Sequence, residues 1–460
     1  MKKFLLIFAC LMTGIPLTYS QRVFTVSELL QDLSVIKSAL QEAHAGTYRY
    51  TDSNLFESRF KSLKKSISRP MNELEFFRIV NPFFASLQDG HTKFHSAGRP
   101  DDLFAFAEKG YFPVPLYFSA DRAHAMANVN SIPVGAELLT IDSRSLKEIQ
   151  TVLFKNMLVD GTGLSMKYEF INDNFAGYYG AFIATPSSFS VRYRFKGKTY
   201  QKSIPSVAAQ VVQKPIVKEQ LYAVKFIGKT AVMRISGFQS EPDGPGFETF
   251  LLETFKKIND IGISKLILDL RNNEGGMDAY GIKLYSYLSD KPFQYYDRFT
   301  VAGLPKYSFA KYAFIPPELE HLKQFIKKSG LEYQFSKKDG LGMQSNDSLS
   351  YKGKLIILIN GKSFSVTSEF ASIAKDNERA VFIGDDTGGA AEGNTSGTFV
   401  FVQLPNSKLE LAIPLLAYHM HLSKRPIKGT GIRPDFRIIP SLSQILEGKD
   451  PVMDRALSIP

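Results

Sequence analysis

The chain has 460 residues, of which 44% are hydrophobic and 22% charged; these fractions are ordinary for a globular protein, and the length exceeds one domain of typical size. The formal net charge is +11, but the basic residues are scattered and form neither dense runs nor patterns interleaved with aromatic residues. The charge therefore indicates a solvated basic surface, and we expect no nucleic-acid partner.

The first twenty residues predict a secretory signal peptide. Lys2 and Lys3 precede an apolar stretch that is too short to span a bilayer, and small residues stand at Thr18 and Ser20. Cleavage after Ser20 would remove the single cysteine, Cys10, so we expect neither a disulfide nor thiol chemistry. A lipid anchor at Cys10 is disfavoured by the very short apolar stretch before it. The predicted location is the periplasm or the cell exterior, without a transmembrane anchor.

Residues 21–110 form the next predicted region, which is helical. Leu29, Leu33 and Ile36 recur at the spacing of an amphipathic helix, and the apolar stretch 73–87 indicates another. The region ends in polar turns, which include the sequence DGHT.

Residues 111–215 are predicted to be a strand-rich module. The stretch 131–153 combines a Pro-Val-Gly turn, a strand, an Asp-Ser turn and a helix, and residues 188–195 alternate as a half-buried strand does. This order resembles a PDZ-like module, and the resemblance implies a groove that accepts an extended peptide by strand addition. A β-rich insert without such a groove fits the same pattern.

Residues 216–460 alternate between strands and helices. This alternation predicts an α/β layer fold with a largely parallel sheet. We expect strands at 230–238, 265–270, 354–360, 380–384, 398–404 and 409–416, helices at 247–258, 277–288 and from about 365, and an insertion at 300–350 with a helical piece at 318–328.

Two turns in this last region carry residues suited to chemistry. The stretch LDLRNNEGG (268–276) ends a buried strand in two glycines, whose amides could face a developing negative charge. A tight strand-to-helix turn explains the same glycines. The stretch NGKSFSVTSEF (360–370) places three serines after a strand, at a predicted helix start near Ser365. Serine is also a favoured helix cap, so one serine alone decides nothing.

Together, DLRNNEGG, SFSVTSEF, KDNERA and TGG resemble the tail-specific, or C-terminal processing, serine peptidases. The resemblance covers roughly residues 220–440. It implies a crotonase-like or ClpP-like spiral core, with Ser365 as the nucleophile and the amides of Gly276 and Val366 as oxyanion donors. With Ser365 placed on the nucleophile, the following residues fall on family positions without a gap: Asp376, Asn377, Arg379, Ala380, Gly384, Thr387 and Gly389.

The sequence departs from that family at two positions. Ser368 stands where the family has a glutamate, and Glu369 follows one residue later, which leaves Ser368 as an alternative nucleophile. Ala390 stands where the family has its general-base lysine, so a Ser-Lys pair is not available there.

A second branch, similar to the tricorn core protease, uses a histidine from a remote N-terminal turn. The turn DGHT (89–92) resembles it, which implies that His91 is the general base. Lys428 stands where that branch has its orienting glutamate, and Asp89, Glu369 and Glu392 remain as alternatives. The other histidines considered, as weaker substitutes for His91, are His44, His95, His419 and His421.

We therefore interpret the sequence as that of an exported serine endopeptidase, which acts on proteins or peptides through an acyl-enzyme. No metal site is apparent, because the pair of histidines in YHMHL (418–422) lacks a third ligand, and no cofactor is expected. The alternative is a family member without catalysis that binds peptides or apolar ligands in its cleft.

Overall fold

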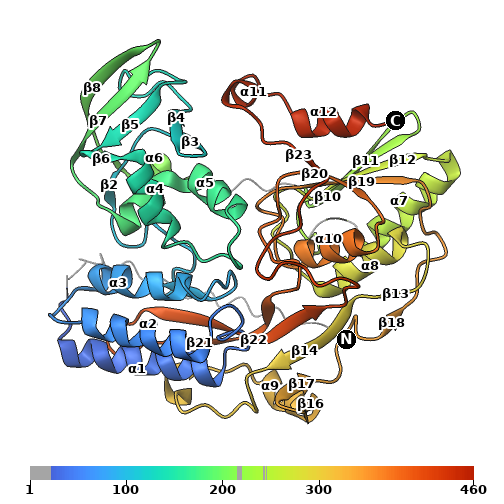
Figure 1. Ribbon diagram of the computed structural model, residues 1–460, viewed down its shortest axis with the longest axis horizontal. Helices are drawn as coiled ribbons and strands as arrows, with labels where there is room; N and C mark the ends of the chain where they lie inside the picture. The colour runs from blue at the N-terminus through green and yellow to red at the C-terminus, as the bar shows by residue number, and fades with distance from the viewer. Residues whose placement is uncertain (1–21, 215–219, 242–243, 245) are drawn as a thin grey trace.

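The computed structural model describes residues 22–214, 220–241, 244 and 246–460 (Figure 1). The predicted signal peptide, residues 1–20, lies outside the described residues. Several strands and helices surround one large hydrophobic core, and a second core fills the module predicted at 111–215.

The N-terminal region is helical, as predicted. It consists of α1 (Val26–Glu42), α2 (Ser53–Ser66) and α3 (Glu73–Ala85). Thr25 and Glu28 form a capping box at the start of α1, which satisfies amides that the helix leaves unpaired. Asp32 of α1 accepts hydrogen bonds from the backbone amides of Asn406 (3.0 Å) and Ser407 (2.8 Å), so the first helix is fixed to the C-terminal half of the chain.

The strand-rich module contains a six-stranded sheet of order β3-β4-β5-β7-β8, with β6 paired to β5. The strands and helices predicted there are present. The sequence analysis gave no helix for the segment that forms α5, the long helix beside this sheet. The elements are β2 (Lys109–Tyr111), β3 (Leu116–Ser119), β4 (Arg122–Ala125), β5 (Glu137–Ile141), β6 (Arg144–Ser145), α4 (Leu146–Phe154), α5 (Ser165–Phe182), β7 (Ser188–Phe195), β8 (Lys198–Pro205), β9 (Val207–Ala208) and α6 (Ala209–Val212).

Helix α5 covers the outer edge of β3, where strand addition would occur. The side chain of Asn172 accepts from the Phe118 amide (2.6 Å) and donates to the Phe118 carbonyl (3.2 Å). The Tyr168 hydroxyl donates to the carbonyl of Ala120 (2.7 Å). A peptide could therefore pair with this edge only if α5 moved, and the likeness to a PDZ-like module stays a prediction.

The C-terminal region contains the predicted parallel sheet, with strand order β10-β11-β12-β19-β20-β23. Only β10 and β11 pair antiparallel among these strands. The elements of this layer are β10 (Tyr222–Ile227), β11 (Thr230–Ile235), α7 (Phe247–Ile261), β12 (Lys265–Asp269), α8 (Asp278–Leu288), β19 (Lys354–Ile359), α10 (Val366–Asp376), β20 (Val381–Gly384), β23 (Phe436–Arg437), α11 (Leu442–Leu446) and α12 (Pro451–Ser458).

Alternate residues of these strands face opposite layers, as the two-residue period of a strand requires. Leu266 and Leu268 of β12 belong to the main core, which includes residues of α7, α8 and α10. Ile267 instead packs in a smaller cluster with Val452 of α12. The sheet is thus covered on both faces, which explains why its strands are continuously apolar. The spiral arrangement implied by the family resemblance stays a prediction.

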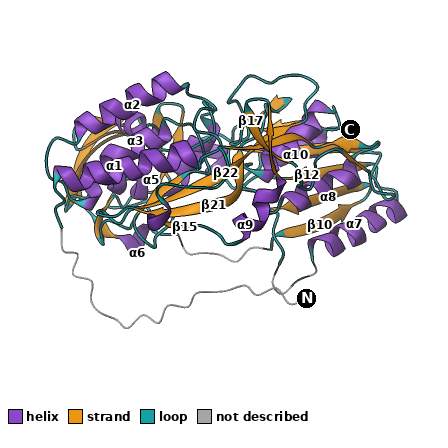
Figure 2. Ribbon diagram, turned by 90° about the horizontal axis from the view of Figure 1, so that it is seen from below, coloured by secondary structure: helices purple, strands orange, loops and turns teal. Residues whose placement is uncertain are grey.

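A second sheet, with order β15-β21-β22-β14-β17-β16, includes three short strands of the predicted 300–350 insertion, β15, β16 and β17. The helix expected over 318–328 is wrong beyond residue 325, because residues 326–329 pair with β17 around a turn at Gly330, whose φ is +60°. The remaining elements are β1 (Lys93–His95), which pairs with β22, β13 (Phe293–Gln294), β14 (Tyr296–Val301), β15 (Ala313–Phe314), α9 (Glu318–Leu322), β16 (Ile326–Ser329), β17 (Glu332–Phe335), β18 (Met343–Gln344), β21 (Thr395–Gln403) and β22 (Glu410–Met420). In the view from below, β21 and β22 run alongside α1 and α3 (Figure 2).

Candidate active site

The structure brings Ser365 and His91 together, although 274 residues separate them in the sequence. The Nε2 atom of His91 lies 3.0 Å from the Oγ atom of Ser365. Ser365 immediately precedes α10, but its side chain makes no hydrogen bond to the helix amides. The helix-cap explanation of this serine is therefore wrong, and its hydroxyl is directed at a histidine instead.

Ser365 has an unusual backbone conformation. Its φ is +56° and its ψ is −128°, a region that residues with a side chain rarely occupy, at a cost of about 1–3 kcal/mol. The turn that carries Gly275 supports this conformation from the neighbouring strand end. The Phe364 amide donates to the Asn273 carbonyl at 3.1 Å, and an added Cβ at Gly275 would lie 2.6 Å from the Cβ of Ser365. Glycine is thus required at 275, because the turn that carries it contacts the turn that carries Ser365 and leaves no space for a side chain.

Asp89 orients the turn that carries His91, rather than the imidazole ring. Its Oδ1 atom accepts from the amides of His91 (3.0 Å) and Thr92 (2.9 Å) and from the Thr92 hydroxyl (3.1 Å). Its Oδ2 atom accepts from the Thr395 hydroxyl on β21. The ring of His91 stacks on Phe364, with 4.6 Å between the centroids. These contacts fix the orientation of the His91 ring, in which Nε2 faces Ser365.

The second ring nitrogen of His91 has no partner. Its Nδ1 atom is buried and makes no hydrogen bond within the described part of the chain. Burial lowers the pKa of His91 to about 4, against the opposing effect of Asp89. The neutral imidazole, which can accept a proton from Ser365, is therefore the form present at neutral pH.

His44 supports the same turn and does not contact Ser365. Its Nδ1 atom accepts from the Gly46 amide (2.8 Å), which places the proton on Nε2, and Nε2 lies 2.6 Å from the Thr92 hydroxyl. Among the other histidines considered, His95 contacts the Ser96 carbonyl and His419 contacts Thr300. His91 is thus the histidine that the structure places against Ser365.

The amides of Gly276 and Val366 are free to bind an anion. Neither makes a hydrogen bond to another group in the part of the chain that the structure describes. Gly276 is held in place because the Phe238 amide donates to the Gly275 carbonyl (2.9 Å) and the Met277 amide donates to the Phe238 carbonyl (2.7 Å). Gly276 also lines a cavity of about 920 Å³.

Ser368, the alternative nucleophile, is fully buried and already bonded. Its hydroxyl donates to the Ser363 carbonyl (2.8 Å) and accepts from the Gly389 amide (3.2 Å). Ser363 is similarly engaged, because its hydroxyl donates to the carbonyl of Leu270 (2.9 Å). The geometry therefore favours Ser365.

Glu369, expected as an orienting acid, binds other partners. It accepts from the Tyr296 hydroxyl (2.5 Å) and from the side-chain Nδ2 of Asn394 (2.8 Å), and it is almost fully buried. Burial raises the pKa of Glu369 to about 8, and the charge of Asp278 adds to the rise. The acid is therefore protonated at neutral pH, and it makes no hydrogen bond to His91.

The buried acid predicts a pH-dependent stability. Between pH 4.5 and 8 the unfolded chain ionises Glu369, whereas the folded protein keeps its proton, so stability falls as pH rises through this window. The loss is on the order of a few kcal/mol. Glu369→Gln removes this dependence. We expect the unfolding free energy of the variant to rise relative to wild type from pH 5 to pH 8 in denaturant titrations; a constant difference would contradict the assignment.

Two further carboxyl groups near the His91 turn have an unpartnered buried oxygen. The sequence analysis missed Asp160, whose Oδ1 accepts from the Gly90 amide at 2.8 Å. Burial raises the pKa of Asp160 to about 7. Glu392, an orienting candidate from the sequence, accepts from the Gly429 amide (2.8 Å) and the Tyr50 hydroxyl (3.0 Å). Neither carboxyl group makes a hydrogen bond to the ring of His91.

Residues 229–438 match the model of peptidase family S41. This part of the chain is therefore similar to the peptidases of family S41. The match includes Ser365 and Gly276, whereas His91 lies outside it. A peptidase of this family acts on proteins or peptides. No curated protein matches the sequence.

The likeness to CPAF covers 94% of the chain and so extends beyond the S41 match. CPAF complexed with lactacystin has 18% identity and a TM-score of 0.64, covering 94% of this chain and 97% of that one. A mutant of CPAF has 16% identity and a TM-score of 0.65, with 94% and 98% covered. The C-terminal processing protease of photosystem II D1 has 16% identity, a TM-score of 0.43, and 92% and 97% covered. The CPAF likeness shows a shared mixed α/β fold.

None of the described helices is long and apolar enough to cross a bilayer. Within the described ranges, no three or more His, Cys, Asp or Glu side chains are grouped as metal ligands would be.

Proposed function

We propose that this chain is a serine-type endopeptidase in which Ser365 is the nucleophile and His91 the general base. The observation that carries the proposal is the 3.0 Å approach of His91 Nε2 to Ser365 Oγ. That distance is within hydrogen-bond reach, which a base needs before its pKa matters. The strained Ser365 conformation, directed away from the helix amides, supports the same role.

The reaction follows from the positions of these groups. The Oγ atom of Ser365 attacks the peptide carbonyl carbon while Nε2 of His91 takes its proton. The carbonyl oxygen becomes an oxyanion, which accepts hydrogen bonds from the Gly276 and Val366 amides. Collapse breaks the C–N bond, and His91 returns the proton to the leaving amine. Water then hydrolyses the acyl-enzyme, with His91 again as the base.

The setting of His91 predicts a slow enzyme. A base whose pKa is about 4 accepts a proton less readily than one matched to neutral pH. In addition, Nδ1 lacks the carboxylate that stabilises the imidazolium in other serine hydrolases. The same observation favours a second candidate function, in which the cleft binds peptides or apolar ligands without cutting them.

A fluorophosphonate probe distinguishes these functions, because it reacts with activated serines. We expect the wild type to be labelled at Ser365, as located by peptide mass spectrometry, and to cleave casein. Ser365→Ala should lose both labelling and cleavage. Ser368→Ala serves as the matched control and should keep the labelling. If the folded wild type is neither labelled nor cleaves casein, the binding function replaces the peptidase.

The lowered pKa of His91 also predicts the pH profile. Because the neutral imidazole is the active form, kcat/KM should stay level from pH 8 to pH 6 and fall only near pH 4–5. An ordinary histidine would lose activity near pH 6.5. The measurement is cleavage of a quenched fluorescent peptide, restricted to the pH range in which circular dichroism shows folded protein. A midpoint near 6.5 would show that His91 is more solvated than the structure indicates.

The place of action is proposed to be the periplasm or the cell exterior. The proposal rests on the signal-like pattern of residues 1–20.

A further inference from the structure

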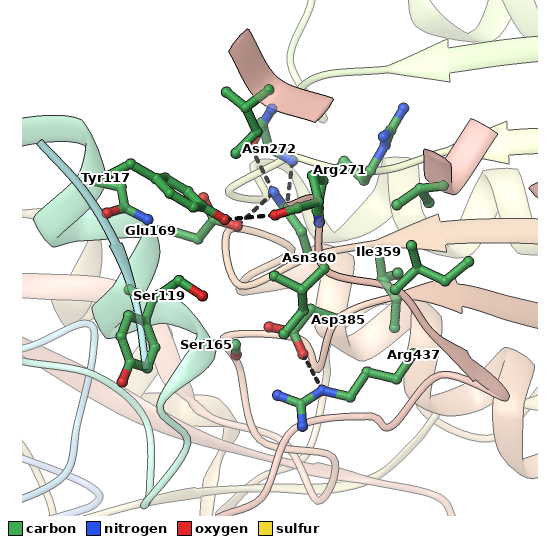
Figure 3. Close-up of a pocket in the computed structure, with 18 of the residues that line it drawn as sticks. Tyr117, Ser119, Ser165, Glu169, Arg271, Asn272, Ile359, Asn360, Asp385 and Arg437 are labelled. Atoms are coloured by element: carbon green, nitrogen blue, oxygen red, sulfur yellow. Dashed lines mark hydrogen bonds and ion pairs between the residues drawn. The ribbon is translucent and has the colours of Figure 1, made fainter. Parts of the chain in front are cut away.

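A cavity of about 610 Å³ lies between the strand-rich module and the parallel sheet (Figure 3). Neither Ser365 nor His91 lines it. It opens at the carboxyl ends of β12, β19 and β20, the edge at which open α/β sheets usually bind ligands. Its volume is in the range of small-molecule sites. The place and size therefore suit a ligand other than the scissile peptide bond.

The wall of the cavity combines apolar side chains with polar and charged ones. The apolar side chains come from the module, from the end of β19 and from the segments that follow β23, and the lining also includes residues at the ends of β11, β12 and β20. The apolar lining includes Phe118, Leu164, Ile359, Ile438, Ile439 and Val452. A ligand that fills the cavity must therefore carry an apolar body.

Two arginines of the lining are already paired with carboxylates. Arg271 binds Asp269 at 2.7 Å and Asp450 at 2.8 Å. Arg437 binds Asp385 at 2.8 Å, as the dashed line in Figure 3 marks. Each guanidinium group therefore already has at least one carboxylate partner, so these two cations are not available to bind an acidic ligand.

Glu169 differs from these three aspartates, because its carboxyl group is hydrogen-bonded to a neutral side chain and not to an arginine. Its Oε1 atom accepts from the Asn360 side chain at 3.1 Å, and Oε2 has no hydrogen-bond partner among the described residues. The nearby cation, Lys362, instead pairs with Asp173 and lies 3.4 Å from Glu274. Glu169 thus presents a carboxyl oxygen to the cavity without a cation of its own.

Ser165 provides a second polar group on the same side. It lies four residues before Glu169 on α5, so the two side chains share one face of the helix. Its hydroxyl is buried, lines the cavity and has no hydrogen-bond partner among the residues that the structure describes. A buried polar atom without a partner is costly, and a hydrogen-bonding ligand would remove this cost.

We propose that this cavity binds a primary amine carried on an apolar body. The ammonium group would donate to Glu169 and to the Ser165 hydroxyl, and the apolar body would pack against Ile438 and Ile439. Charge-assisted hydrogen bonds of this kind are about twice as strong as neutral ones, and they discriminate an amine from an alcohol. The site does not depend on the proposed peptidase reaction.

The test uses hexylammonium and the full chain at pH 8, with hexanol as the uncharged analogue. Isothermal titration calorimetry should show binding of hexylammonium and about tenfold weaker binding of hexanol. Glu169→Gln should weaken hexylammonium binding about tenfold, and Ser165→Ala severalfold. Glu248→Gln, an exposed carboxylate of α7, is the matched control and should change nothing.

The ionisation of Glu169 gives a further readout. The charged groups around it are Asp173, Lys362 and Asp385, and burial together with Asp173 raises the pKa of Glu169 to about 7. Hexylammonium should therefore bind more weakly at pH 6 than at pH 8, because the carboxylate gains a proton. The pH dependence should be absent in Glu169→Gln.

Two sources could supply the amine: a small molecule or the N-terminus of a peptide. A Leu-Leu-Leu peptide with a free N-terminus and its N-acetylated form distinguish them. If both hexylammonium and the free peptide bind, the site is supported and its ligands include peptide N-termini. If hexylammonium binds and the free peptide does not, the site is supported as one for small amines. Three results would overturn the proposal. They are equal binding of hexanol and hexylammonium, unchanged hexylammonium affinity in both folded variants, and no binding of either amine at millimolar concentration.

Discussion

Replacing His91 with alanine is expected to lower kcat by about 10²–10⁴-fold, with little change in KM. The imidazole lies 3.0 Å from Ser365 Oγ, and the Ser365 hydroxyl has no other hydrogen-bond partner among the described residues. Without this base, the hydroxyl must lose its proton to water. The measurement is steady-state cleavage of a quenched peptide by the wild type and by His91→Ala.

A matched control separates the loss of the base from the loss of any histidine. His421 is exposed and its side chain makes no hydrogen bond within the described residues, so His421→Ala should keep wild-type kcat. Circular dichroism should show equal folding of both variants, because truncation of His91 removes a stacked ring from Phe364. A folded His91→Ala that cleaves at the wild-type rate would place the base elsewhere and refute the histidine assignment.

The resemblance to the serine peptidases predicted Ser365 and His91 as a pair, and short local patterns carry that resemblance. Ser365 stands in a turn that follows a buried strand, and His91 stands in a four-residue polar turn. The same reasoning predicted the strands and helices of the parallel sheet, because their apolar patterns are continuous or periodic. Local patterns of this kind survive even when the segments that carry them are hundreds of residues apart.

The partners of His91 were not predictable in the same way. Asp89 was an orienting candidate because of its position, yet its oxygens are used by backbone amides and by hydroxyl groups. Asp160, which contacts the amide of Gly90, comes from a loop whose sequence carries no motif. Such contacts depend on how segments that are distant in the sequence pack together. A short sequence pattern does not show which distant segment will lie beside it.

The covered edge of β3 illustrates a related limit. The resemblance of residues 111–215 to a PDZ-like module implied a groove open to strand addition, with a β-rich insert as the alternative. The structure shows that the Asn172 side chain of α5 occupies the backbone groups of Phe118, as a neighbouring strand would. A side-chain amide can replace a strand because it has both a donor and an acceptor. The pattern of β3 alone could not show this contact.

Replacing Gly276 with alanine is expected to lower kcat about 10²–10³-fold, the usual effect of losing one oxyanion donor. Its φ is +142°, which disfavours any residue with a side chain, and an added Cβ would lie 2.3 Å from the Phe238 carbonyl oxygen. The backbone at 275–277 must therefore shift, and the Gly276 amide moves with it. The same shift should cost about 1–3 kcal/mol of stability.

Gly163→Ala is the matched control for this variant, because an added Cβ there meets open space. It should leave kcat unchanged and keep stability within about 1 kcal/mol of wild type. Fluorophosphonate labelling of Ser365 should slow in Gly276→Ala but not in Gly163→Ala, since phosphonylation also develops negative charge on an oxygen. A folded Gly276→Ala with wild-type kcat would show that the Gly276 amide does not stabilise the oxyanion. Loss of kcat without slower labelling would place the defect in peptide binding or in deacylation.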